Sequence, residues 1–202
     1  MSTPNLVRMG GLAAVVAAVL FVVGDLVSFA IDFENRSEAA TTAPFFLTFL
    51  LYLLGTVLLL VGLVGLYVRQ AESTGTLGLV GFAAAFLGSA LILGAAWAQF
   101  FVAPFLASEA PGALDTEPTG MLSVGFILSF SLSALGWFLF GIATLRARVY
   151  PRAAAIVLMV GAALSFLPIP ASGMILNVAV GWLGFTLFTG KGLPAGQPSR
   201  VS

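Results

Sequence analysis

The stretch PFFLTFLLYLLGTVLLLVGLVGLYV, residues 44–68, carries no charged side chain over its whole length. A helix that crosses a bilayer needs about 20 mostly apolar residues. Pro44 at the start suits the first turn of a helix. The run is continuously apolar rather than alternating, which favours a helix over a strand of a membrane barrel. We therefore predict a transmembrane helix over 44–68.

The composition of the whole chain agrees with this prediction. The chain has 202 residues, of which 60% are hydrophobic and 8% are charged, whereas soluble domains are about 25% charged. A soluble fold this poor in charge could not cover its surface with polar groups. The expected surroundings are therefore a lipid bilayer.

Five more apolar runs resemble the first. We predict an all-α membrane protein, a six-transmembrane-helix bundle in one domain over residues 1–190, with spans at about 9–31, 44–68, 76–107, 119–147, 152–167 and 172–190. The run 76–107 exceeds the length that a bilayer needs, and Pro104 is expected to kink its end. Residues 191–202 have the composition of turn and coil and are predicted to form a short disordered tail in the cytoplasm.

Charge placement predicts the orientation. With six spans, every basic residue except Arg36 falls on one side, and every acidic residue except Glu72 falls at or beyond the opposite ends of the helices. Because cytoplasmic loops of membrane proteins are enriched in Lys and Arg, both termini are expected in the cytoplasm. The predicted location is the cell membrane, with the chain crossing it several times.

A cleaved signal peptide is an alternative interpretation of the first segment. Residues 28–30, SFA, have the small side chains of a cleavage site, and Arg8 provides a charged start. The apolar run is long for a signal peptide, however, and Asp25 interrupts it. Cleavage would leave five spans with the basic loops still in the cytoplasm.

Weak internal similarity predicts three helical-hairpin repeats. GLVGLYVR at 62–69 is similar to GIATLRAR at 141–148, and GWFLFG at 136–141 is similar to GWLGFT at 181–186. Parallel repeats of this kind occur in some transporters. Chance similarity is the alternative, since apolar helices draw on few residue types.

Several kinds of chemistry are excluded. The chain has no Cys and no His, so a disulfide, a thiolate centre, imidazole metal ligands and a Ser–His pair are ruled out. No motif indicates a cofactor, a metal or a catalytic residue. Net charge is zero, which provides no attraction for nucleic acid.

Asp25, in FVVGDLVSFA at residues 21–30, is the first candidate for a ligand or ion contact. It shares a helical stripe with Ala14, Ala18 and Phe21, which turns it toward the bundle. The rise of a helix places it roughly 26 Å from Arg8, near the edge of a hydrocarbon core about 30 Å thick. It is either an ion- or proton-binding group or a structural acid near water.

Two further polar residues are candidates at a similar depth. Asn177 lies between Gly173 and Gly181 at every fourth position, which indicates either a hydrogen bond between helices or a ligand contact. Gln99 stands beside Trp97, a pairing typical of an interfacial anchor. If they converge with Asp25, these side chains would line a polar pocket that opens outward.

The segment RARVYPR, 146–152, offers Arg146, Arg148 and Arg152 to anionic lipid head groups, or else serves only to fix the orientation. The surrounding stretch LGWFLFGIATLRARVYPRAAAIVLMVGAAL, 135–164, resembles the uncharacterised small multi-pass membrane proteins common in high-GC bacteria. The likeness covers one hairpin of the three and implies no activity. The residues that carry it are Gly136, Trp137, Phe140, Gly141, Arg146, Pro151 and Arg152.

Three classes of function remain open. The sequence favours a non-catalytic scaffold or partner subunit, which implies a homo-oligomer or another membrane protein as partner. The alternative is a small transporter or channel with an outward-facing pocket around Asp25. A lipid-modifying enzyme is the least favoured class, because only one candidate carboxylate lies within the spans.

Overall fold

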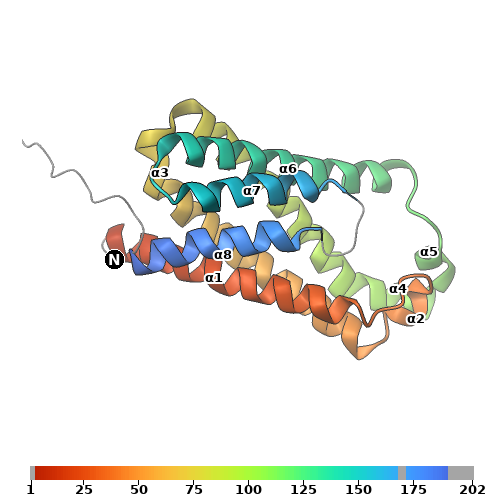
Figure 1. Cartoon of the computed structure of the whole chain (residues 1–202). Helices are drawn as coiled ribbons and strands as arrows, with labels where there is room; N and C mark the ends of the chain where they lie inside the picture. Colours follow the sequence, from red (N-terminus) through yellow and green to blue (C-terminus); the bar gives the residue numbers. More distant parts are fainter. Residues whose placement is uncertain (1–2, 168–171, 191–202) are drawn as a thin grey trace, which may run out of the picture.

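The computed structural model describes residues 3–167 and 172–190, and this part of the chain forms helices without any strand (Figure 1). The predicted tail at 191–202 lies outside the described residues. The elements in chain order are α1 (Thr3–Ser28), α2 (Arg36–Ala39), α3 (Ala43–Trp97), the π-helix η1 (Ala98–Val102), α4 (Ala103–Glu109), α5 (Pro111–Asp115), α6 (Gly120–Ala147), α7 (Arg152–Leu164) and α8 (Met174–Thr189).

A single glycine folds α3 back on itself. Gly75 has φ 56° and ψ −150°, which is not helical and is a conformation open almost only to glycine. The ring of Tyr67 stacks on Phe82 at 4.3 Å, and Phe46 meets Phe100 at 6.2 Å. The predicted spans 44–68 and 76–107 are therefore antiparallel partners, and we call residues 43–74 and 76–97 the first and second arms of α3.

The disturbance predicted around Pro104 takes the form of a π-helix. Pro104 stands in the first turn of α4, directly after η1. Proline has no N–H to donate, and its ring clashes with the carbonyl four residues earlier. The wider π turn before Pro104 accommodates both effects without ending the helix.

Small residues set the distances between helices. A Cβ built on Gly62 of α3 would lie 2.8 Å from Ala14 Cβ, and one built on Gly184 of α8 would lie 2.7 Å from the same atom. A Cβ on Gly81 would lie 2.6 Å from the backbone nitrogen of Phe140 in α6. Backbones that approach this closely leave no room for larger side chains. The first arm packs on α1, the second arm packs on α6, and α8 packs on α1.

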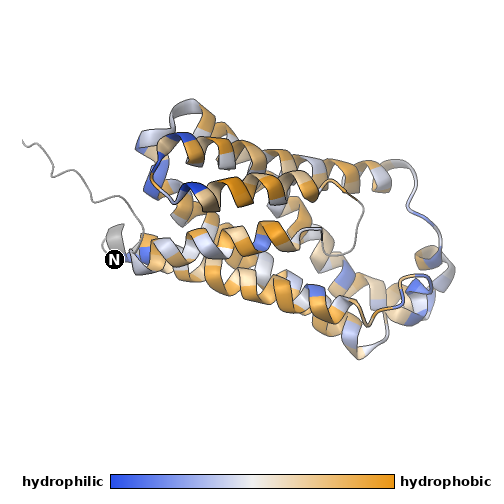
Figure 2. Cartoon of the chain, in the orientation of Figure 1, coloured by the Kyte–Doolittle hydropathy of each residue, from blue (hydrophilic) through white to orange (hydrophobic). Residues whose placement is uncertain are grey.

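The largest side chains of the interior fill the space between these helices, with Trp137, Phe140, Leu63, Leu66, Leu158 and Leu183 each fully buried. Many other large apolar side chains are exposed on the outside. Figure 2 shows that hydrophobic residues run along most of the length of the helices. Within the described residues, three segments are long and apolar enough to cross a membrane: Val7–Ser28, Ala43–Glu109 and Gly120–Ala147. This pattern is compatible with a membrane protein.

The last two predicted spans are shorter than expected. Helix α7 has 13 residues and α8 has 16, so at 1.5 Å per residue they extend about 20 and 24 Å. Neither matches the roughly 30 Å of a hydrocarbon core. Together they form a short antiparallel hairpin.

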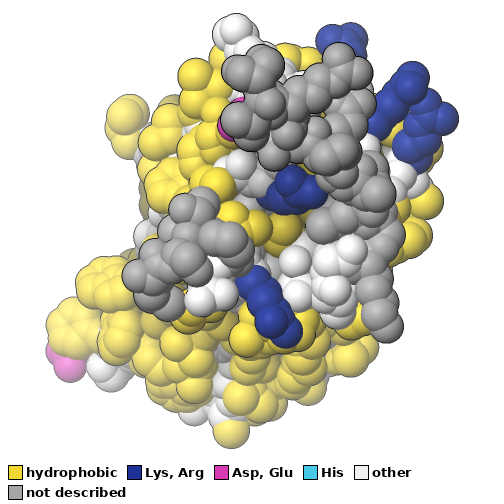
Figure 3. All heavy atoms as spheres, turned by 90° about the vertical axis from the view of Figure 1, so that its left-hand side faces the viewer, with side chains coloured by type: hydrophobic (Ala, Val, Ile, Leu, Met, Phe, Trp, Pro, Cys, Tyr) yellow, Lys and Arg dark blue, Asp and Glu magenta, His cyan; other side chains and the backbone are white. Residues whose placement is uncertain are grey.

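The charges gather at the two ends of the bundle. At one end Arg8 lies 4.9 Å from the ring of Phe188, and Tyr150 donates a hydrogen bond to the carbonyl of Leu66. We call this the basic end, and Figure 3 shows its Arg side chains. At the opposite end Arg36 pairs with Glu117 at 3.0 Å. This acidic end also carries Asp32, Glu34, Glu38, Glu109 and Asp115.

The turn at Gly75 allows a direct test. A Cβ at Gly75 would meet nothing within 4 Å, so Gly75→Ala acts only through the backbone. We expect it to lower the free energy of unfolding by about 1–3 kcal/mol. Gly94→Ala is the matched control, because Gly94 has equally open surroundings but lies within the helix; it should stabilise by about 0.5–1 kcal/mol. Thermal unfolding in detergent measures both, and equal effects would contradict this account of the turn.

Candidate functional site

Two cavities lie in the half of the bundle nearer the acidic end. The smaller one, which we call the inner cavity, has a volume of about 180 Å³. It is lined by Phe21, Thr56, Leu59, Ser89, Ile92, Phe130, Ser133, Ala134, Trp137, Ser165, Ser172, Gly173, Leu176 and Asn177. These residues come from α1, both arms of α3, α6, α8 and the ends of the α7–α8 link. Six of them are polar and none is charged.

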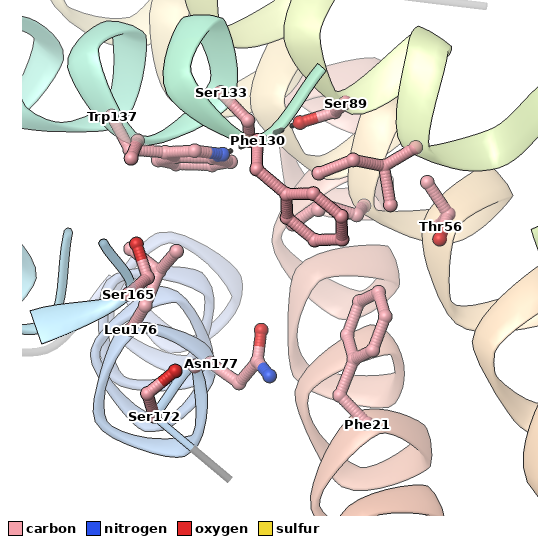
Figure 4. Close-up of a pocket in the computed structure, with 14 residues that line it drawn as sticks. Phe21, Thr56, Ser89, Phe130, Ser133, Trp137, Ser165, Ser172, Leu176 and Asn177 are labelled. Atoms are coloured by element: carbon pink, nitrogen blue, oxygen red, sulfur yellow. Dashed lines mark hydrogen bonds between the residues drawn. The ribbon is translucent and has the colours of Figure 1, made fainter. Parts of the chain in front are cut away.

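Hydrogen bonds fix part of this lining (Figure 4). The indole N–H of Trp137 donates to Ser89 Oγ at 3.3 Å. The hydroxyl of Thr56 donates to the carbonyl of Tyr52, and that of Ser165 donates to the carbonyl of Ala162, both at 2.7 Å. A hydroxyl that donates in this way can still accept. Thr56 and Ser165 therefore face the cavity as acceptors, whereas the hydroxyl of Ser89 keeps its own donor.

The larger cavity, which we call the vestibule, has a volume of about 800 Å³. It is bounded by α2, α5 and the start of α6 on one side and by α3, η1 and α4 on the other. Phe130 of α6 lines both the vestibule and the inner cavity. The two spaces therefore meet at one aromatic side chain, whose exposed fraction is 53%.

A polar clasp joins α2 to α5 beside the vestibule. The backbone N–H and the hydroxyl of Ser37 donate to the two carboxylate oxygens of Asp115 at 2.9 and 2.8 Å. These two hydrogen bonds, the backbone one first, hold the pKa of Asp115 below its usual value. The ion pair of Arg36 with Glu117 lies beside them. It is exposed, so its contribution to stability is small.

The structure places the predicted site residues in three different surroundings. Asn177 lines the inner cavity, and Gln99 lines the vestibule. Asp25 lines neither of these cavities. The three side chains therefore do not form one pocket, although the inner cavity and the vestibule adjoin at Phe130.

Asp25 is buried between α1 and the first arm of α3, with 8% of its surface exposed. Ala14 and Ala18 of the predicted stripe are buried as well. The hydroxyl of Tyr52 donates to Asp25 Oδ1 at 2.7 Å. The predicted neighbours of this carboxyl were Gln99 and Asn177, whereas its observed partner is Tyr52.

The arginines proposed to contact lipid are all exposed at the basic end. Helix α6 ends at Arg148, which has a left-handed backbone with φ 55°. Tyr150 is 3% exposed and fixes the loop to α3 through its hydrogen bond to Leu66; burial raises the pKa of this phenol. The loop therefore presents Arg146, Arg148 and Arg152 from a well-anchored turn.

One signal for the missed residues was present in the sequence. Thr48, Tyr52 and Thr56 recur at every fourth position within the apolar run 44–68, so they share one face of the helix. A polar stripe in an otherwise apolar helix indicates a face turned toward other polar groups. Phe130 had no such signal, since it is one of 18 phenylalanines.

Comparison with known proteins does not add to this geometry. The chain matches no protein-family model, no curated protein and no solved structure. The resemblance to small multi-pass membrane proteins of high-GC bacteria stays a prediction. The function is therefore argued from the site alone.

The clasp supports a pH-dependent prediction. Because the pKa of Asp115 is lowered in the folded chain, its stabilising effect is present above the ordinary pKa of a carboxyl and is lost as the pH falls through the lowered value. At neutral pH, Asp115→Ala should speed hydrogen exchange of the Ser37 amide by about threefold to tenfold. Glu109→Ala, an exposed acid on α4, should leave that amide unchanged. Unaltered exchange in Asp115→Ala would show that the clasp does not form.

Proposed function

We propose that the chain is a non-catalytic, multi-pass protein of the cell membrane that binds a small neutral molecule from the outer side. The inner cavity is the observation that carries this proposal. It is lined by hydroxyls, an amide and apolar side chains, and it adjoins a vestibule at the acidic end. Pockets that recognise small molecules commonly combine apolar walls with a few placed polar groups.

The distribution of charge supports the orientation. Figure 3 shows Arg side chains gathered at the basic end, which the positive-inside tendency assigns to the cytoplasm. The sequence positions of this end carry Arg8, Arg69, Arg146, Arg148 and Arg152. In this arrangement α1, the two arms of α3 and α6 cross the bilayer. The α7–α8 hairpin enters the bilayer from the cytoplasmic side and returns to it, in the place of the last two predicted spans. Both termini are then cytoplasmic whether or not the hairpin reaches the far surface.

The lining limits what the ligand can be. A cavity of about 180 Å³ is close in size to the engineered cavity of about 150 Å³ that holds benzene. Since no charged side chain lines it, an ion would enter without a counter-charge, which is costly. The hydroxyls and the amide of the wall can both donate and accept, so they suit a polar group such as a hydroxyl or an amide. A compact neutral alcohol or amide with an apolar body fits these conditions.

The same lining argues against catalysis. Four serines face or border the inner cavity, but none of the residues lining it is titratable near neutral pH. A serine hydroxyl needs an adjacent base to act as a nucleophile. Binding, with or without passage of the solute, is therefore better supported than a reaction.

A partner subunit is the second candidate function. The first half of α6 is largely exposed, with Met121 at 83% and Ile127 at 65%. A Cβ on Gly125 of this half would meet nothing within 4 Å. A small residue on an uncovered helix face is typical of contact between membrane helices. A second copy of the chain or another membrane protein would fit there.

Benzyl alcohol, an aromatic ring that bears one hydroxyl group, is a suitable probe for the inner cavity. In a Trp97→Phe, Trp182→Phe background only Trp137 remains to report on the inner cavity by fluorescence. We expect a saturable change on titration, weakened about fivefold to tenfold by Asn177→Leu, since one hydrogen bond contributes about 1 kcal/mol. Asn177→Leu should not lower thermal stability, because its amide has no hydrogen bond within the described part of the chain.

Val178→Leu is the matched control, because Val178 is the next residue on α8 and points outward with an exposed fraction of 51%. Its titration should equal that of the background protein. Absence of any saturable change in the background would contradict solute binding and leave the partner-subunit function. A loss of stability in Asn177→Leu with an unchanged titration would show that the residue is only structural.

A further inference from the structure

The carboxyl of Asp25 has one oxygen without a partner. Asp25 Oδ1 accepts from Tyr52, but Asp25 Oδ2 is buried and has no hydrogen bond to any described residue. A buried polar atom without a partner is costly, and a charged one is more so. The residue is more than nine-tenths buried, so bulk water does not relieve this cost.

A second buried oxygen without a partner lies where the first arm of α3 packs against α1, an interface that we call the α1–α3 seam. Thr48 has no exposed surface, and its Oγ1 has no hydrogen bond within the described ranges. Thr48 precedes Tyr52 by four residues and so shares its face of α3. Gly62 lies against Ala14, and Gly24 lies against Tyr52. Continued by one turn, this antiparallel register places Thr48 opposite Ser28.

Four side chains that carry oxygen therefore lie at one end of the α1–α3 seam: those of Asp25, Ser28, Thr48 and Tyr52. The hydroxyl of Ser28 donates to the carbonyl of Asp25 at 2.7 Å and can still accept. No hydrogen bond joins Asp25 Oδ2 to Thr48 Oγ1. A cation bound at this end of the seam would satisfy Asp25 Oδ2, and the hydroxyl of Thr48 lies about one helical turn away.

The electrostatic field at the C-terminal end of α1 favours a cation beside Asp25. Asp25 lies in the last turn of α1, where the helix dipole is negative and a carboxylate is unfavourable. No basic residue stands in that turn. Arg36, the basic residue that the described part of the acidic end carries, pairs with Glu117 instead.

The groups that face Asp25 supply no compensating charge. Tyr52 is the titratable side chain that faces it from α3, and α8, which also packs on α1, carries none. The carboxyl of Asp32, beyond the end of α1, accepts hydrogen bonds from the backbone N–H of Glu34 and the side-chain amide of Asn35. The site can thus hold at most one negative charge, which suits a monovalent ion better than Ca²⁺ or Mg²⁺.

We propose that this cluster binds one monovalent cation, either Na⁺ or a proton, at Asp25 Oδ2. Sodium would be held by Asp25 Oδ2, Thr48 Oγ1 and the hydroxyl oxygens beside them. A proton would reside on Oδ2 and be donated toward Thr48. Asp25 lines neither cavity, so this site is separate from the one proposed for the neutral solute. The test of cation binding therefore does not depend on whether the inner cavity binds a solute.

The sodium arm of the test uses thermal unfolding of the full chain in detergent at mildly alkaline pH. Sodium replaces choline at constant ionic strength. If sodium is the ligand, the midpoint rises along a saturable, single-site curve. Asp25→Asn abolishes the rise, and Thr48→Val weakens the apparent affinity at least tenfold. Asp32→Asn, an exposed acid of the same end, leaves the curve unchanged.

The proton arm uses infrared absorption by the protonated carboxyl group in sodium-free buffer. If the proton is the ligand, a carboxylic C=O band is present near neutral pH and disappears on raising the pH. The band is absent from Asp25→Asn and is retained in Asp32→Asn. Tyr52→Phe and Thr48→Val shift the pH at which the carboxylic band disappears. This shift can be measured even if Asp25→Asn fails to fold.

The two arms separate the outcomes. A sodium effect or a carboxyl band that depends on Asp25 supports the proposal and names the cation. The proposal is overturned if sodium has no effect on wild type or Thr48→Val and no carboxyl band titrates. The two unpartnered oxygens would then be bridged by a structural water only.

Discussion

Close approach of helix backbones is the constraint on which the rest of this structure depends. Within a bilayer the hydrophobic effect does not draw helices together, so close van der Waals packing must do so. Here Gly62 and Gly184 both lie against Ala14, and Gly81 lies against the backbone of α6. These contacts fix α1, α3, α6 and α8 as one bundle. They also set the register that brings Tyr52 to Asp25.

The short α7–α8 hairpin explains why the cavities occupy one half of the bundle. The hairpin packs against α6 and α1, but α7 extends only about 20 Å. Residues at its tip, Ser165, Ser172 and Gly173, border the inner cavity. Toward the basic end the space between helices is filled by Phe140 and leucines such as Leu66. Toward the acidic end the first half of α6 is uncovered, and the vestibule lies beside it.

The sequence predicted the helical class and the two polar ends because both follow from hydropathy and charge. It also predicted the inward direction of Asp25, since a stripe of alanines marks a packed face. It did not predict how Asp25, Gln99 and Asn177 are distributed, because their positions depend on the register between helices. Gly75 was assigned to a link between spans, whereas it is a single-residue turn within α3. The spacing of Thr48, Tyr52 and Thr56 was readable, but their partner on α1 was not.

The central claim is that the acidic end, with its vestibule, faces outward and the basic end faces the cytoplasm. The chain has no native cysteine, so single-cysteine variants give an unambiguous readout. Ala113 lines the vestibule, and Ser73 lies exposed beside the Gly75 turn. Ala113→Cys should react with a membrane-impermeant thiol reagent on intact cells. Ser73→Cys should react only after permeabilisation. Labelling of Ser73→Cys on intact cells, with Ala113→Cys protected, would contradict the orientation and the outward opening of the site.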